Sequence, residues 1–194
     1  MKRKASLKRK TKETDIEIEI NLDGKGNYNI ETPVGFLNHM LELFSKFAKF
    51  DLKIKAKGDI EVDTHHTVED IGICLGSVIN KALLDKKGIK RFGFSSAPMD
   101  EVLVNVSLDI SGRPFLVFNV PIIKGREGSF EIEDAREFLR GFVNHLGLTL
   151  HINLVYGENL HHVLEAVFKG LGLALKEAVK IEGKKLPSTK GKID

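Results

Sequence analysis

Short runs in which apolar and polar residues alternate recur along the chain, and each predicts a β-strand. In the first run, residues 15–22, an isoleucine or leucine stands at every second position. A turn sequence follows at 23–26 and a short apolar stretch near 28–30, so this part of the chain predicts a β-hairpin. Comparable strand patterns lie at 52–56, 60–62, 102–110, 115–119 and 148–154.

Two helical patterns interrupt the strands in each half of the chain. The first pattern, at residues 37–48, has the same spacing of apolar residues as residues 135–146, which lie 98 residues further along the chain. In the other, the apolar positions that follow His65 return 96 positions later, after His161. The repetition predicts an internal duplication.

The duplication divides the chain into a first structural repeat at 1–84, a connector and second structural repeat at 85–183, and a C-terminal tail at 184–194. We expect an α+β fold, an internally duplicated domain in which each half is a mostly antiparallel four-stranded sheet with two helices packed on one face. Two copies are too few for a stacked solenoid, so the halves are expected to meet about a pseudo-twofold axis in one compact domain.

Composition places the chain among globular proteins, because 194 residues with 42% hydrophobic content suffice for a substantial core. No run of about 18 apolar residues is present, and the basic start has no apolar stretch after it. We therefore expect no membrane span, no secretory signal and a cytoplasmic location. The single Cys74 cannot form an internal disulfide and is expected to be a small buried residue.

The charge distribution gives no clear partner. The net charge is +3, and seven of the first twelve residues are Lys or Arg. A basic arm can bind nucleic acid, but this one lacks aromatic residues that would stack on bases. We expect neither nucleic acid nor a membrane as a partner.

Two copies of a His-His-x-x-Glu motif stand at equivalent places, at 65–69 and 161–165. On a helix this spacing presents two imidazoles and a carboxylate together, which is a set of metal ligands. A single copy is explained as well by a polar helix start whose Glu is favoured by the helix dipole. Two copies at matching positions favour metal binding, because packing and capping require no histidines at mirrored sites.

The duplication extends the ligand set, because His39 in the first half maps onto Glu137 in the second. Imidazoles and carboxylates without thiolate suit Mn²⁺, Fe²⁺ or Zn²⁺, and the sequence does not choose among them. His145 and His151 have no histidine counterpart and are expected to be structural or surface residues. The candidate ligands, enough for two ions with four each, are His39, His65, His66, Glu69, Glu137, His161, His162 and Glu165.

With these residues identified, the sequence resembles the imidazoleglycerol-phosphate dehydratase family over nearly its whole length. Some matching segments are weak alone, but together, in order and at family spacing, they are highly specific. They lie at 11–14, 35–40, 58–59, 63–70, 91–93, 98–101, 111–114, 150–152, 157–162, 165–169 and 187–191.

The resemblance implies a lyase of histidine biosynthesis that converts imidazole glycerol phosphate to imidazole acetol phosphate and water. It also implies two Mn²⁺ ions per active site, with other divalent ions possible, and no organic cofactor. The proton to be removed lies beside a neutral imidazole and is barely acidic. Two ions, one on each ring nitrogen, would hold the ring as imidazolate, which could expel the hydroxyl through a diazafulvene-like intermediate.

The resemblance also implies a ligand pairing that draws on both halves, at sites between the subunits of a homo-oligomer, a 24-subunit cubic assembly. By the family pattern, one ion would take His65, His161, Glu165 and Glu137, and the other His39, His66, Glu69 and His162.

Further roles follow from the resemblance. Glu13 matches an acidic active-site residue, a candidate for substrate contact and proton transfer; without the resemblance it would be an exposed Glu at a strand edge. With His65 and Glu165 it forms the expected catalytic set. The positions that match holders of the substrate phosphate, two of them in the C-terminal tail, are Arg91, Arg113, Lys169, Ser188 and Lys190.

Several positions depart from the family pattern. Asn38, Phe47 and Thr64 stand where the family commonly has Asp, His and Asp. The orientation of His39 is therefore expected to rest on the amide of Asn38. Glu137 is His in many members, so one ion would be held by two His and two Glu.

Two other functions stay open at this point. A binuclear metal-dependent hydrolase of phosphate esters would use the same ions and basic residues, although such sites usually rely on bridging Asp. Alternatively, the metals could be staples between subunits without catalysis, in which case chelation would dissociate the oligomer and Glu13 would have no catalytic effect.

Overall fold

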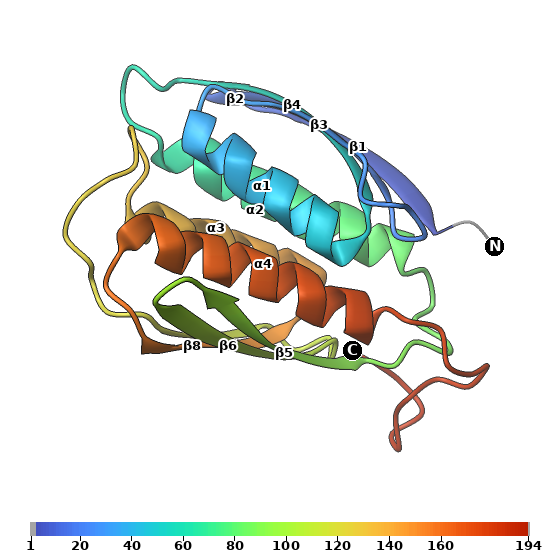
Figure 1. Ribbon diagram of the computed structural model, residues 1–194. Coiled ribbons are helices and arrows are strands. Elements are labelled where there is room, and N and C mark those ends of the chain that lie inside the picture. Colours follow the sequence, from blue (N-terminus) through green and yellow to red (C-terminus); the bar gives the residue numbers. More distant parts are fainter. Residues whose placement is uncertain (1–2, 194) are drawn as a thin grey trace.

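A computed structural model describes residues 3–193 as four layers, with two layers of helices between two β-sheets (Figure 1). Helices α1 and α2 cover the inner face of the first sheet, and α3 and α4 cover the inner face of the second. In chain order the elements are β1 (Lys4–Lys10), β2 (Thr14–Asn21), β3 (Tyr28–Glu31), α1 (Gly35–Ala48), β4 (Asp51–Gly58), α2 (His65–Ala82), β5 (Phe92–Met99), β6 (Val102–Asp109), β7 (Phe115–Asn119), α3 (Ile132–Leu146), β8 (Thr149–Tyr156) and α4 (Leu160–Ala178).

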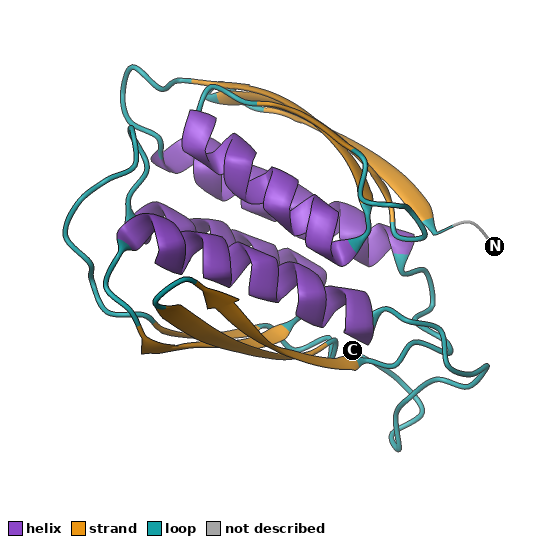
Figure 2. Ribbon diagram, viewed as in Figure 1, coloured by secondary structure: helices purple, strands orange, loops and turns teal. Residues whose placement is uncertain are grey.

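The two sheets have the same topology. Their strand orders are β1-β2-β4-β3 and β5-β6-β8-β7, and in each sheet only the last pair is parallel. The expected α+β duplication, with a four-stranded sheet and two helices in each half, is confirmed (Figure 2). Alternation explains the buried faces: Ile16, Ile18 and Ile20 of β2 lie in the core, while Glu17 and Glu19 between them are exposed.

Four local predictions are wrong or incomplete. Strands β2 and β3 do not form a hairpin, because β4 lies between them and pairs with both. Residues 60–62 form a turn region instead of a strand, with Ile60 and Val62 exposed. The basic arm forms the edge strand β1, whose Ala5 and Leu7 pack against the core, and the predicted connector contains β5.

The helices of the two halves pack on each other, α1 with α4 and α2 with α3. Glycines permit the close approach: a Cβ at Gly76 of α2 would lie 2.4 Å from the carbonyl oxygen of Phe142, and a Cβ at Gly172 of α4 would lie 2.8 Å from that of Phe44. These two contacts are equivalent under the duplication, since both pairs are related by the sequence offsets of 96 and 98. The halves therefore share one core.

That core is apolar throughout. Phe44 and Phe142 meet edge to face with ring centroids 6.4 Å apart, and Phe138 and Phe168 lie 5.4 Å apart. Cys74 is buried as expected, and burial raises the pKa of its thiol to about 11. Within residues 3–193, no helix has the length and apolar character needed to span a membrane.

The substitution Gly76→Ala tests the helix contact. The added methyl group would meet a backbone oxygen that cannot move aside, so we expect a loss of about 1–3 kcal/mol in the free energy of unfolding. Urea unfolding at a fixed chain concentration measures this loss. Gly35→Ala is the control, because nothing lies within 4 Å of a Cβ there. A Gly76→Ala protein as stable as the parent would contradict the close packing of α2 on α3.

Candidate metal centre

The first cluster of candidate ligands joins the two halves of the chain. His161 and Glu165 stand one turn apart on α4, and Nε2 of His161 lies 3.2 Å from Oε1 of Glu165. The same oxygen lies 3.0 Å from Nε2 of His39 on α1. One ligand atom from each residue falls within 4.8 Å of the other two, close enough to share an ion.

Glu165 is an anion surrounded by donors. Burial, the largest single influence, would raise its pKa, but Lys169, His39 and His161 together lower the pKa to about 2. Its second carboxylate oxygen accepts from Nζ of Lys169. The carboxylate is therefore charged at any physiological pH, as a metal ligand must be.

The counterparts of this first cluster under the duplication are His65, Glu69 and Glu137, whose ligand atoms do not all lie within 4.8 Å of one another. Nε2 of His65 lies 3.7 Å from Oε2 of Glu69, one turn apart on α2. Glu137, the counterpart of His39, lies on α3, where Nη1 of Arg140 donates to its Oε2 at 2.8 Å. A Cβ at Gly141, the next turn of α3, would lie 2.9 Å from the carbonyl oxygen of Glu69. The packing of α3 on α2 thus repeats that of α1 on α4.

This grouping differs from the pairing expected from the sequence. That pairing put His39 with His66, Glu69 and His162, whereas within one chain the structure brings His39 to His161 and Glu165. Within one chain this follows from the extensive contact of α1 with α4.

The second histidine of each motif is held by a carboxylate from outside the motif. Nδ1 of His66 lies 3.0 Å from Oδ2 of Asp59, and Nδ1 of His162 lies 2.8 Å from Oε2 of Glu101. These hydrogen bonds, before any other influence, raise the pKa of both imidazoles. In each ring they leave Nε2 for other contacts, and Nε2 of His162 lies 3.7 Å from Oδ2 of Asp100. The sequence assigned no role to Asp59 or Glu101, although both lie in segments that match the family.

Glu13 lies at the exposed turn between β1 and β2. Its backbone N–H donates to Oγ1 of Thr11, and the turn is anchored by Thr14, whose hydroxyl donates to Asp70 at 2.6 Å. Arg9 donates to the same carboxylate. Because Asp70 directly follows Glu69 on α2, the turn with Glu13 is tied to the first motif.

The residues expected to hold phosphate are spread over two regions. Arg91 donates from Nε and Nη2 to Asp109 at 2.6 and 2.9 Å, and from Nη1 to the carbonyl oxygen of Pro187 at 2.8 Å. It therefore fixes the start of the tail segment that contains Ser188 and Lys190. Lys169 instead contacts Glu165 and Met99, and Arg113 is exposed.

Other predicted residues have structural contacts. The amide of Asn38 exchanges two hydrogen bonds of 3.1 Å with the backbone of Thr32 and none with His39. His145 bonds to the carbonyl oxygen of Gly141 at 2.9 Å, and His151 is exposed on the second sheet.

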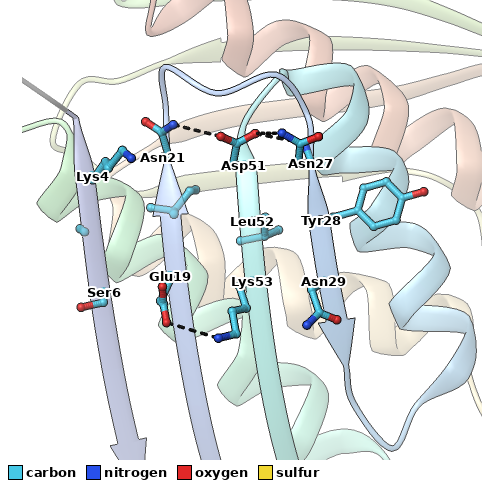
Figure 3. Close-up of a pocket in the computed structure, with 12 residues that line it drawn as sticks. Lys4, Ser6, Glu19, Asn21, Asn27, Tyr28, Asn29, Asp51, Leu52 and Lys53 are labelled. Atoms are coloured by element: carbon cyan, nitrogen blue, oxygen red, sulfur yellow. Dashed lines mark hydrogen bonds and ion pairs between the residues drawn. The ribbon is translucent and has the colours of Figure 1, made fainter.

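The outer face of the first sheet has a hollow of about 660 Å³ (Figure 3). At its rim Asp51 accepts hydrogen bonds from the backbone of Lys25 and from Asn27 and Asn21, which lower the pKa of its carboxyl. None of the expected site residues lines this hollow.

Comparisons with known proteins point to one family. A model of the family described as imidazoleglycerol-phosphate dehydratase matches residues 32–175. The protein of that name from Thermoanaerobacter pseudethanolicus is 59% identical over 191 residues, which are 97% of this chain and 98% of the relative. That from Citrifermentans bemidjiense is 52% identical over the full length of both.

Solved structures give the same answer. The chain is similar to the crystal structure of imidazoleglycerol-phosphate dehydratase from Staphylococcus aureus, with a TM-score of 0.83, 41% identity, and coverage of 92% of this chain and 99% of the other. It is also similar to IGPD from Pyrococcus furiosus, with a TM-score of 0.84, 42% identity, and coverage of 96% and 99%.

The substitution Arg91→Lys should loosen the C-terminal tail. Lysine cannot bind Asp109 with two donors while reaching Pro187, and hydrogen bonds to charged groups contribute about 1.5–3 kcal/mol each. We expect the amides of 182–188 to exchange with solvent at least about tenfold faster, measured by hydrogen exchange with mass spectrometry. Arg136→Lys is the control, since that guanidinium lies over the ring of Phe118. Unchanged exchange in the tail would show that Arg91 does not hold it.

Proposed function

The chain belongs to the imidazoleglycerol-phosphate dehydratase family and is a dehydratase of histidine biosynthesis, and we propose that it works with two divalent metal ions, preferably Mn²⁺. The observation that carries this proposal is the convergence of His39, His161 and Glu165 from two helices of different halves. One member of this cluster, Glu165, is a buried carboxylate, and a buried charge requires compensating partners.

The residues fit the ions chemically. One ion would be held by His39, His161 and Glu165, and the other by the duplicate set His65, Glu69 and Glu137. Imidazole and carboxylate donors without thiolate suit Mn²⁺, although Fe²⁺ and Zn²⁺ would also bind. This grouping follows the helix contacts within one chain. The pairing across subunits that the resemblance implies stays a prediction.

His66 and His162 would complete the sites of neighbouring subunits. Neither belongs to the cluster of His39, His161 and Glu165, and their side chains are 38% and 27% exposed. A homo-oligomer, of 24 subunits as the resemblance implies, is also supported by the outer face of the second sheet. That face exposes Phe92, Phe94 and Phe115, whereas the equivalent face of the first sheet exposes charged residues at 17, 19, 53, 55 and 57.

The chain's own residues would bind the substrate and move its protons. When bound, the ions would supply Lewis-acid withdrawal of electrons from the substrate ring. Glu13, exposed on a fixed turn near His66, would take or deliver the proton. Arg113, Lys169, Ser188, Lys190 and the remaining donors of Arg91 would hold the phosphate.

His65 and Glu165 would take part in catalysis as ligands. A cytoplasmic location belongs to the same proposal, because a phosphorylated substrate is charged and does not cross a bilayer unaided. We do not propose hydrolysis of phosphate esters, because no observation of this structure favours that reaction over the activity of the family.

The direct test is to incubate protein loaded with Mn²⁺ with imidazole glycerol phosphate. We expect a ketone that retains its phosphate, abolition of turnover by a chelator and recovery with added Mn²⁺. Release of inorganic phosphate, or turnover that is indifferent to chelation, would contradict the proposal.

Metal content tests the two ligand sets. We expect Glu137→Gln and Glu165→Gln each to lower the content from about two to about one Mn²⁺ per chain, because a neutral amide is a poor ligand. Elemental analysis after gel filtration measures this. Glu133→Gln, one turn before Glu137 on α3 and exposed, is the matched control. A variant that keeps both ions removes its residue from the ligand set.

Glu13→Gln should separate chemistry from metal binding. We expect kcat to fall by about 10²–10⁴, the usual contribution of a general acid or base, with unchanged Mn²⁺ content. Glu19→Gln, an exposed Glu on the neighbouring strand, should keep full activity. Steady-state kinetics measures both, and a Glu13→Gln enzyme with normal kcat would exclude proton transfer by this residue.

A further inference from the structure

Glu13 and Glu101 occupy equivalent positions in the duplicated fold. Glu13 directly precedes β2 and Glu101 directly precedes β6, which are the second strands of two sheets with identical order. The register agrees, since Ile18 pairs with Ile54 in the first sheet as Val106 pairs with Ile152 in the second. His66 and His162 are equivalent as well, so each half has the same glutamate beside the same histidine.

The two glutamates nevertheless make different contacts. Glu101 accepts a hydrogen bond from Nδ1 of His162 at 2.8 Å. Within residues 3–193 Glu13 makes no hydrogen bond with His66, although its charge raises the pKa of that imidazole. Nδ1 of His66 instead donates to Asp59 at 3.0 Å.

The segment that joins β4 to α2, or β8 to α4, explains why the histidine has a different carboxylate partner in each half. In the first half it is the longer segment 59–64, and its first residue, Asp59, reaches back to His66 on α2. In the second half it is only 157–159. Glu158 makes no hydrogen bond or ion pair with His162 in the part of the chain described here, so Glu101 fills that role from the β5–β6 turn.

Stability alone does not account for Asp59. Its Oδ1 is buried without a hydrogen-bond partner among residues 3–193, a condition that costs about 1–3 kcal/mol. Asp100, which precedes Glu101, has a left-handed φ of 47°, a conformation that Asp adopts more readily than most residues. The carboxylate of Asp59 is thus held in place against a local cost.

We propose that Asp59 and Glu101 are positioning residues, which keep the proton of His66 and His162 on Nδ1 and so leave the lone pair of Nε2 to bind a metal ion. A carboxylate on the far nitrogen of a ligand histidine fixes the tautomer and ring orientation. The two equivalent glutamates would then have different roles. Because Asp59 holds His66, Glu13 is available for proton transfer, whereas Glu101 is hydrogen-bonded to His162. This inference rests on the proposed function.

Mn²⁺ binding by purified full-length protein tests it, with the paramagnetic resonance signal of free Mn²⁺ as the readout. We expect Glu101→Ala to weaken one ion per chain by about 10–100-fold while the other ion is unchanged, and Asp59→Ala to do the same to a different ion. Glu101→Gln, whose amide oxygen still accepts from Nδ1, should restore part of the affinity. Glu61→Gln, in the same loop as Asp59 and exposed, should bind like the parent.

Two further measurements distinguish positioning from general damage. Adding Glu101→Ala to His162→Ala should weaken binding no further, because the carboxylate acts only through this imidazole. Saturating Mn²⁺ should restore turnover to Glu101→Ala but not to Glu13→Gln. If Glu101→Ala does not fold, the conservative Glu101→Gln, with a smaller loss of affinity, gives the same comparison.

Distinct outcomes overturn distinct claims. Parent protein that fails to bind two Mn²⁺ per chain would refute the proposed metal dependence. Parent protein that binds two ions, with both alanine variants binding equally tightly, would leave the proposed function intact and refute the positioning role.

Discussion

The site depends on the pairing of helices across the duplication. Glycines at 76 and 172 let the backbones of α2 and α3, and of α4 and α1, approach to contact with a carbonyl oxygen. Because the helices of each pair come from different halves, His39 and Glu137 are each brought to a motif that lies far away in the sequence. The cluster of His39, His161 and Glu165 therefore cannot form within one half of the chain.

This packing also sets the electrostatics. Glu165 is buried, which by itself would favour its neutral form, yet two imidazoles and an ammonium group keep it ionised. Its partners thus counter the cost of desolvation and keep the carboxylate in the form that the proposed metal binding requires. The carboxylates of Asp59 and Glu101 likewise accept hydrogen bonds from His66 and His162, while Oδ1 of Asp59 is buried without a partner among residues 3–193.

Sequence patterns could predict the duplication, the four helices and the ligand types, because a period of 3.6 residues and a copied motif are local signals. They could not predict which helix pairs with which, because that depends on contacts such as Gly76 on Phe142, distant in the chain. Within one chain His39 therefore lies beside His161 and Glu165, whereas the expected pairing across subunits stays a prediction. Strand β1 was missed because lysines mask its alternation, and the hairpin was wrong because β4 inserts between β2 and β3.

Diffraction from crystals of Mn²⁺-loaded protein, recorded at the manganese absorption edge, tests the account most directly. Two anomalous peaks per chain should appear, one among His39, His161 and Glu165 and the other among His65, Glu69 and Glu137, each approached by Nε2 of a histidine from a neighbouring subunit. A single peak, or peaks remote from both helix pairs, would contradict the mirrored cation sites on which the account is built.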